Sequence, residues 1–223
     1  MSPADESREA EAEGFVLAGG RSSRMGTDKA LVPLAGRPLI AHAVSILHEA
    51  GLQATIAGAR SPLAEFAPVI EDSELDRGPL VGICEALAAS TVRWAVFLPV
   101  DLPLLPASLL LYLLRHACTT AAAATLASLN GFAETFPAVI DRAALPVLQN
   151  ELRAGRGGCF SAFQAAAERL GRPISVLPVE GLVQCGAVAH PAGLPAIRWF
   201  LNLNSSEQLH RAENCLRGPH RVS

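Results

Sequence analysis

Apolar runs of strand length alternate with segments whose apolar residues recur at helical spacing along most of the chain. The first apolar run covers residues 14–18 and ends in two glycines, and a polar segment follows it to Lys29. Residues 38–47 then carry apolar side chains at helical spacing, begin with a proline suited to a first helical turn and stop near Gly51. Strands that alternate with helices in this way predict a parallel, right-handed α/β sheet.

The alternation continues beyond residue 52. We expect strands at residues 53–57, 68–70, 93–100, 121–129, 174–178 and 199–203, an apolar segment at 136–140, and helices at 80–89, 107–117, 145–154, 160–170 and 205–216. The run at 93–100 is apolar almost throughout, which is typical of a strand that is covered on both faces. Residues 121–124 favour a helix by residue propensity, but their place in the alternation favours a strand.

Composition and charge describe a single globular domain. Half of the 223 residues are hydrophobic, 17% are charged and the formal net charge is −3, which argues against nucleic-acid binding by general electrostatics. We expect residues 1–13 to form a disordered acidic tail and residues 14–223 to form one domain. The most apolar stretch, residues 94–114, contains Asp101 and three prolines, so we expect no membrane span and a cytoplasmic protein.

The strongest chemical signal lies in residues 17–31, which read Leu-Ala-Gly-Gly-Arg-Ser-Ser-Arg-Met-Gly-Thr-Asp-Lys-Ala-Leu. Gly19 and Gly20 directly follow a predicted strand, so the backbone can approach a ligand closely and point its N–H groups at phosphate oxygens. Arg24 and Lys29 are among the three cations beside that anion site. The glycine spacing fits neither the dinucleotide fingerprint nor the P-loop. An ordinary glycine turn with solvated cations is the alternative.

Asp101 follows the apolar run at residues 93–100. Ligands of open parallel sheets bind outside the carboxyl ends of the strands, and a carboxylate there can hold Mg²⁺, which takes few protein oxygens together with waters and phosphates. Asp101 is therefore the candidate metal ligand, and the alternative is a solvated aspartate in a turn. A weaker signal is Glu71-Asp72-Ser73 followed by residues 78–82, whose glycines leave room for a base or ribose.

Four motifs together resemble the molybdenum cofactor guanylyltransferases, the MobA-type nucleotidyltransferase family. They are the segment from Leu17 quoted above, Glu-Asp-Ser-x4-Gly-Pro-Leu-x-Gly from Glu71, Pro-Val-Asp-Leu-Pro from Pro99 and Phe-Leu-Asn-Leu-Asn-Ser-Ser-Glu-Gln-Leu from Phe200. The opening motif is shared by many nucleotidyltransferases that release pyrophosphate. The closing motif narrows the resemblance to the molybdopterin branch.

This resemblance implies a Rossmann-like, three-layer α/β/α fold with a mostly parallel sheet. It also implies transfer of GMP from GTP to the phosphate of molybdopterin, with Mg²⁺ as cofactor and with molybdoenzymes or cofactor-delivery proteins as candidate partners. The implied nucleotide site comprises Leu17, Ala18, Gly19, Gly20, Lys29, Asp72 and Asp101. Arg24, Lys29 and Asp101 are the expected catalytic residues, because in-line attack by a phosphate needs positioning and positive charge rather than a protein nucleophile.

Asn202 and Asn204 are the candidate contacts to the acceptor. They alternate with Leu201 and Leu203, so on the predicted strand both amides share one face. The amide-like edge of a pterin ring offers donors and acceptors that match them. The alternative for Asn204 is that it only caps the helix that starts at Ser205.

Two segments depart from the family pattern and bear on base and acceptor specificity. The loop after the second strand reads Ala57-Gly58-Ala59-Arg60, where the family often has asparagine, and the acceptor-side loop at residues 131–137 has Phe136 before its proline.

Two other functions stay open. A cytidylyltransferase of the same cofactor tends to read Leu-Ala-Ala-Gly in the opening motif, so Gly20 favours guanylyl transfer. A non-catalytic nucleotide-binding carrier or chaperone for molybdoenzymes would not need Arg24, Lys29 and Asp101 together.

Overall fold

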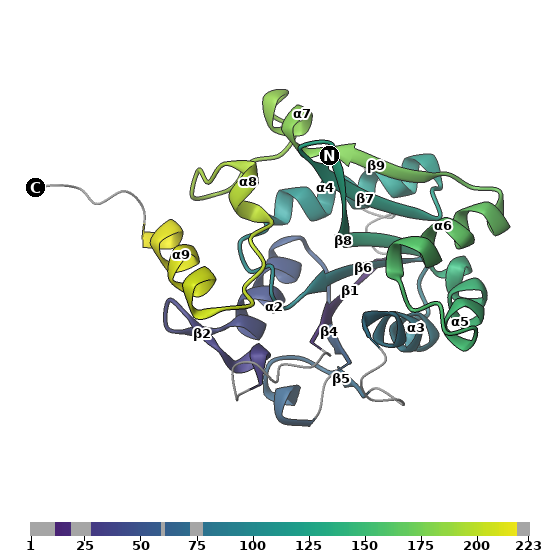
Figure 1. Cartoon of the computed structure of the whole chain (residues 1–223), viewed down its shortest axis with the longest axis horizontal. Helices are drawn as coiled ribbons and strands as arrows, with labels where there is room; N and C mark the ends of the chain where they lie inside the picture. Colours follow the sequence, from purple (N-terminus) through teal and green to yellow (C-terminus); the bar gives the residue numbers. More distant parts are fainter. Residues whose placement is uncertain (1–11, 19–27, 59–60, 72–77, 218–223) are drawn as a thin grey trace, which may run out of the picture.

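The computed structural model describes residues 12–18, 28–58, 61–71 and 78–217 (Figure 1). Its central sheet contains β1 (Ala12–Leu17), β4 (Ala54–Ala57), β5 (Val69–Ile70), β6 (Trp94–Pro99), β7 (Ala124–Leu129), β8 (Phe132–Asp141) and β9 (Ile174–Pro178). The strands lie in the order β5-β4-β1-β6-β8-β7-β9. β8 runs antiparallel to β6 and β7, and the other neighbouring strands are parallel. The predicted α/β fold with a mostly parallel sheet is confirmed.

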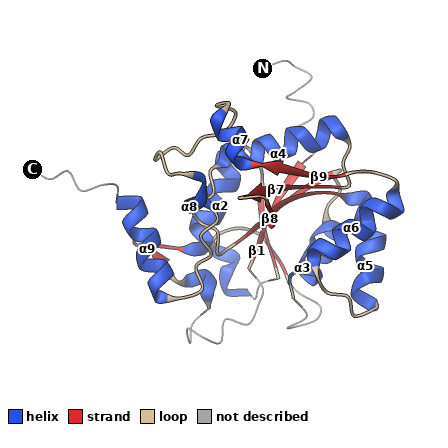
Figure 2. Cartoon of the chain, turned by 45° about the horizontal axis from the view of Figure 1, so that its top comes forward, coloured by secondary structure: helices blue, strands red, loops and turns tan. Residues whose placement is uncertain are grey.

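Helices cover both faces of this sheet (Figure 2). They are α2 (Leu39–Glu49), α3 (Pro79–Ala89), α4 (Ala107–Thr120), α5 (Leu145–Arg153), α6 (Cys159–Leu170), α7 (Val179–Gln184), α8 (Ala196–Trp199) and α9 (Ser206–Arg217). One face packs against α2, α4 and α7, and the other packs against α3, α5 and α6. A short antiparallel hairpin of β2 (Pro33–Leu34) and β3 (Arg37–Pro38) precedes α2.

The two central strands bury both of their faces. Val16 and Val96 belong to the core that contains α2 and α4, whereas Phe15 and Phe97 belong to the core that contains α3 and α6. The rings of Phe15 and Phe97 are stacked, with their centroids 5.5 Å apart. Side chains of a strand alternate between faces, so continuous apolar runs are required where both faces are covered.

The prediction for residues 121–129 is confirmed in part. α4 ends at Thr120, and Ala121 takes a left-handed backbone conformation with φ of 50°, which stops the helix. β7 begins at Ala124 and pairs with β8 and β9. Helix propensity was therefore overridden by pairing on both sides of the strand.

The predicted strand at residues 199–203 is wrong. α8 ends at Trp199, whose buried indole donates a hydrogen bond to the carbonyl oxygen of Leu194 at 2.8 Å. The following segment is joined to the sheet region by a hydrogen bond of 3.1 Å from Leu203 N–H to the carbonyl oxygen of Asp101. A strand needs a row of such bonds along a neighbour, and this segment instead crosses the turn that follows β6.

Of the predicted tail, residues 1–11 lie outside the described part of the chain, and β1 begins at Ala12. Among the described residues, no helix is both long enough and apolar enough to cross a bilayer.

Candidate active site

A cavity of about 460 Å³ lies at the carboxyl ends of β1 and β6. Its walls come from the end of β1, from the short 3-10 helix η1 (Lys29–Leu31), from the turn after β6, from β8 and from the segment before α9. The predicted site residues that line it are Leu17, Ala18, Lys29, Asp101 and Asn202. This is the edge at which open α/β sheets bind ligands.

Backbone hydrogen bonds just beyond the ends of the strands fix the part of the chain at the end of β1 that lines the cavity. Val100 N–H donates to the carbonyl oxygen of Leu17 at 3.0 Å, and Ala18 N–H donates to that of Ala57 at 3.0 Å. These bonds extend the parallel pairing by one residue on each side of β1. The backbone at Leu17 and Ala18 is therefore held in place where it meets the cavity.

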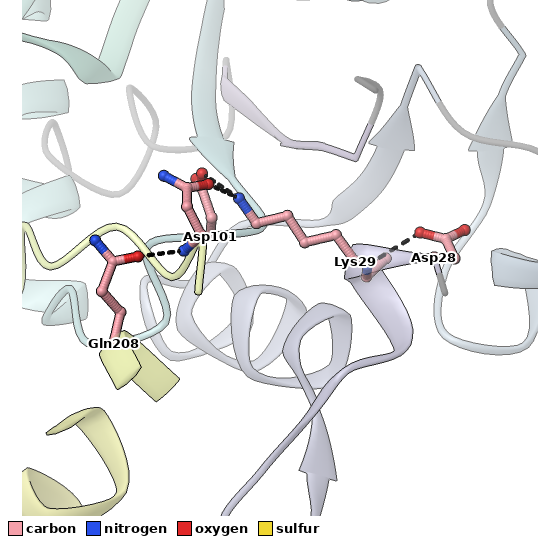
Figure 3. Close-up of polar contacts among 6 residues, drawn as sticks. Asp28, Lys29, Asp101 and Gln208 are labelled. Carbon is pink, nitrogen blue, oxygen red and sulfur yellow. Dashed lines mark hydrogen bonds and ion pairs between the residues drawn. The ribbon is translucent and has the colours of Figure 1, made fainter. Parts of the chain in front are cut away.

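Lys29 and Asp101 meet at the wall of the cavity (Figure 3). Asp28 accepts a hydrogen bond of 3.0 Å from Ala30 N–H and so caps η1, the helix that carries Lys29. Lys29 Nζ donates to Asp101 Oδ2 at 2.8 Å and to the side-chain oxygen of Asn204. The Lys29 and Asp101 side chains are each about one-fifth exposed. The ion pair is therefore mostly shielded from bulk water, but a ligand in the cavity can still reach it.

Asn204 belongs to the start of α9 but does not cap it. Ser205 Oγ accepts a hydrogen bond of 3.2 Å from Gln208 N–H, and Gln208 Oε1 accepts one of 2.7 Å from Asn204 N–H. The cap is therefore Ser205, whose hydroxyl lies three residues before the N–H that it satisfies, and the alternative that Asn204 only caps this helix is wrong. The Asn204 amide oxygen is left to bind Lys29.

The donor set at Asp101 suits a magnesium ion. Lys29 contacts Oδ2, and no residue in the described part of the chain donates a hydrogen bond to Oδ1. The described residues contain no cluster of three or more His, Cys, Asp or Glu side chains that could hold a metal. Mg²⁺ is usually bound through one or two carboxylates together with waters and substrate phosphates, so a single carboxylate fits.

β8 contributes residues that the sequence analysis named only as part of the acceptor-side loop at residues 131–137. Leu126 pairs with Ala138 but the next residue, Ala127, pairs with Glu134, so residues 135–137 bulge out of the ladder. Thr135, which lies in this bulge, and Glu134, which lies beside it, both line the cavity. The signal in the sequence for this bulge was the proline at position 137. Proline has no N–H to donate to a ladder hydrogen bond, so within sheets it marks bulges or edge strands.

The Glu134 carboxyl is half-buried, and burial raises its pKa above the ordinary value. No described residue donates a hydrogen bond to it or forms an ion pair with it. The cavity thus holds a carboxylate that is partly removed from water and has no partner among these residues.

Several predicted site residues lie outside the described part of the chain, namely Gly19, Gly20, Arg24 and Asp72. The departure at Ala59 and Arg60 also lies outside it.

Comparison with known proteins gives consistent matches. Residues 14–174 match the family model described as "MobA-like NTP transferase domain". A protein of Xanthomonas euvesicatoria named "Molybdenum cofactor guanylyltransferase" is 47% identical over 109 residues, which cover 47% of this chain and 56% of that protein. A protein of Haloferax mediterranei named "Probable molybdenum cofactor guanylyltransferase" is 31% identical over 206 residues, which cover 88% of this chain and 90% of that protein.

A solved structure shares the fold. The crystal structure of molybdopterin-guanine dinucleotide biosynthesis protein A from Archaeoglobus fulgidus matches with a TM-score of 0.71 and 22% sequence identity. The match covers 90% of this chain and 96% of that chain. The fold is therefore shared with a protein that has diverged widely in sequence.

Proposed function

Because the chain belongs to the MobA-like NTP transferase family, we propose that it transfers GMP from GTP to the phosphate of molybdopterin and releases pyrophosphate. The observation that carries this proposal is the meeting of Lys29 and Asp101 at the wall of a cavity at the carboxyl edge of the sheet. Relatives at 31% and 47% identity carry the name molybdenum cofactor guanylyltransferase.

The nucleotide occupies the β1 half of the cavity in this proposal. The fixed backbone at Leu17 and Ala18 forms the start of the phosphate loop. On the family motif we assign Gly19, Gly20 and Arg24 to the rest of that loop and Asp72 to the guanosine. The molybdopterin phosphate attacks the α-phosphorus, the bond to the β-phosphate oxygen breaks, and pyrophosphate leaves.

Lys29 stabilises the negative charge that develops during this displacement. Its ammonium is already held at the cavity by Asp101 and Asn204, so little reorganisation is needed when the phosphates arrive. Asp101 would hold Mg²⁺ through its carboxylate. When bound, that ion supplies positive charge to the phosphates and orients them.

The acceptor occupies the opposite half of the cavity. Asn202 lines the cavity and is exposed, so its amide is available to a ligand. Asn204 uses its amide oxygen on Lys29 and keeps its amide N–H groups for the acceptor. We assign both asparagines to the molybdopterin side.

This assignment predicts that Asn202→Ala raises the molybdopterin concentration needed for half-maximal rate by about 10-fold, because one or two hydrogen bonds are lost. The dependence on GTP should not change. Separate titrations of the two substrates measure both effects. An unchanged dependence on molybdopterin would remove Asn202 from the acceptor site, and Gln184→Ala, which changes an exposed amide side chain on α7, is the matched control.

The overall function is tested by incubating the protein with molybdopterin, Mg²⁺ and either GTP, CTP or ATP. We expect molybdopterin guanine dinucleotide and pyrophosphate to form in equal amounts with GTP. Preferential product formation with CTP would identify a cytidylyltransferase. Nucleotide binding without any product would identify a non-catalytic carrier.

We place this reaction in the cytoplasm, where GTP is made and used. A molybdoenzyme or a cofactor-delivery protein is the candidate partner that receives the product.

A further inference from the structure

Glu134 occupies an unusual position in the cavity. Its carboxyl is half-buried and lines the same cavity as Lys29 and Asp101, but no described residue forms a hydrogen bond or ion pair with it. Moving a carboxylate partly out of water costs free energy unless hydrogen bonds replace those to water. A ligand that donates hydrogen bonds would supply that compensation.

The order of the strands in the sheet indicates which of the two substrates lies beside Glu134. β6, which carries Asp101 at its end, lies between β1 on one side and β8 on the other. Leu17 and Ala18 line the β1 half, whereas Glu134 lines the β8 half. If the nucleotide is on β1 and its α-phosphate is near Asp101, the attacking substrate must approach from β8.

We propose, on the basis of the function proposed above, that Glu134 binds the 2-amino-4-oxopyrimidine edge of the pterin ring of the acceptor. That edge presents two adjacent donors, the ring N3–H and the exocyclic 2-amino group. A carboxylate has two oxygens that accept such a pair in parallel. Glu134 thereby determines acceptor specificity and has no part in bond making.

An aromatic neighbour supports this role. Phe136 lines the cavity from the same bulge of β8, and part of its side chain packs against the hydrophobic core, which holds it in place. Aromatic rings favour contact with flat heteroaromatic rings over contact with water. This part of β8 thus offers the pterin ring an apolar surface from Phe136 and two hydrogen-bond-accepting oxygens from Glu134.

The test uses pterin and lumazine, in which a carbonyl oxygen replaces the 2-amino group. Both are added to the full chain with Mg²⁺ and saturating GTP, so that the nucleotide half is filled, and binding is followed by quenching of ligand fluorescence. Neither ligand has a phosphate, so no transfer occurs. We expect the wild-type chain to bind pterin at least about 10-fold more tightly than lumazine, because lumazine loses a donor and sets an oxygen against the carboxylate.

The matched variants are Glu134→Gln, which removes the double acceptor, and Glu168→Gln, which changes an exposed glutamate on α6. The first should lose the preference for pterin and the second should keep it. Equal thermal unfolding midpoints would show that both variants are folded. No binding of pterin, equal affinity of the wild type for both ligands, or an unchanged preference in Glu134→Gln would overturn the assignment.

The outcome is separable from that of the proposed function. A chain that transfers GMP to molybdopterin but does not distinguish pterin from lumazine would contradict the Glu134 assignment alone. A chain that distinguishes the two ligands through Glu134 but transfers no GMP would contradict the proposed reaction alone.

Discussion

Asp101→Asn is expected to reduce the turnover of GMP transfer by at least about 10²-fold, which is typical of the loss of one preorganised electrostatic contact. Asparagine has nearly the same shape and keeps an oxygen that can accept from Lys29 Nζ, so the geometry of the wall should persist. What is lost is the negative charge that would hold Mg²⁺ at the end of β6.

The measurement is turnover at saturating GTP and molybdopterin over a range of Mg²⁺ concentrations. Circular dichroism and thermal unfolding check the fold, which should be intact because the backbone hydrogen bond from Leu203 N–H to Asp101 does not involve the side chain. Near-normal turnover in a folded variant would be incompatible with a metal ligand at this position.

Lys29→Ala should slow the transfer by about 10² to 10³-fold, because a cation that faces the reacting phosphates stabilises charge that grows in the transition state. The loss should appear mainly in turnover. The Asp101 side chain is partly exposed, so water can solvate the carboxylate that the substitution leaves unpaired. The same assay of GMP transfer measures the effect.

Arg37→Ala is the matched control for this substitution. Arg37 lies on β3, is exposed and donates hydrogen bonds to Ser45 Oγ and to the carbonyl oxygen of Ala41, which are both on α2. It does not line the cavity. Equal losses in the two variants would mean that Lys29 acts through net charge alone and that the loop it follows is not the phosphate site.

Much of the fold can be predicted from the sequence because the patterns involved are local. The apolar run at residues 93–100 predicts a strand buried on both faces, and β6 has that burial from Trp94 to Leu98. The proline at the start of α2 and the glycine and proline at the start of α3 also act within one helical turn. Such signals depend on a few neighbouring residues.

Two features of the fold could not be predicted from local patterns. They are the antiparallel direction of β8 and the absence of a strand at residues 199–203. An apolar strand has the same residue pattern whether it runs parallel or antiparallel, and only its neighbours decide its direction. The alternating Leu and Asn residues around 202 satisfy a strand pattern, yet the segment finds no edge to pair with along its length.

The sequence by itself determined the chemical groups of the site: a glycine-rich segment before Lys29, an aspartate after a buried strand, and two asparagines before the last helix. Only the tertiary structure decided how they are used. Lys29 lies 72 positions from Asp101 and 175 from Asn204, and it contacts both. Glu134 lines the cavity where β8 bulges, directly before residues 135–137. Contacts at such separations depend on how the sheet aligns the ends of its strands, and no local pattern of residues encodes that alignment.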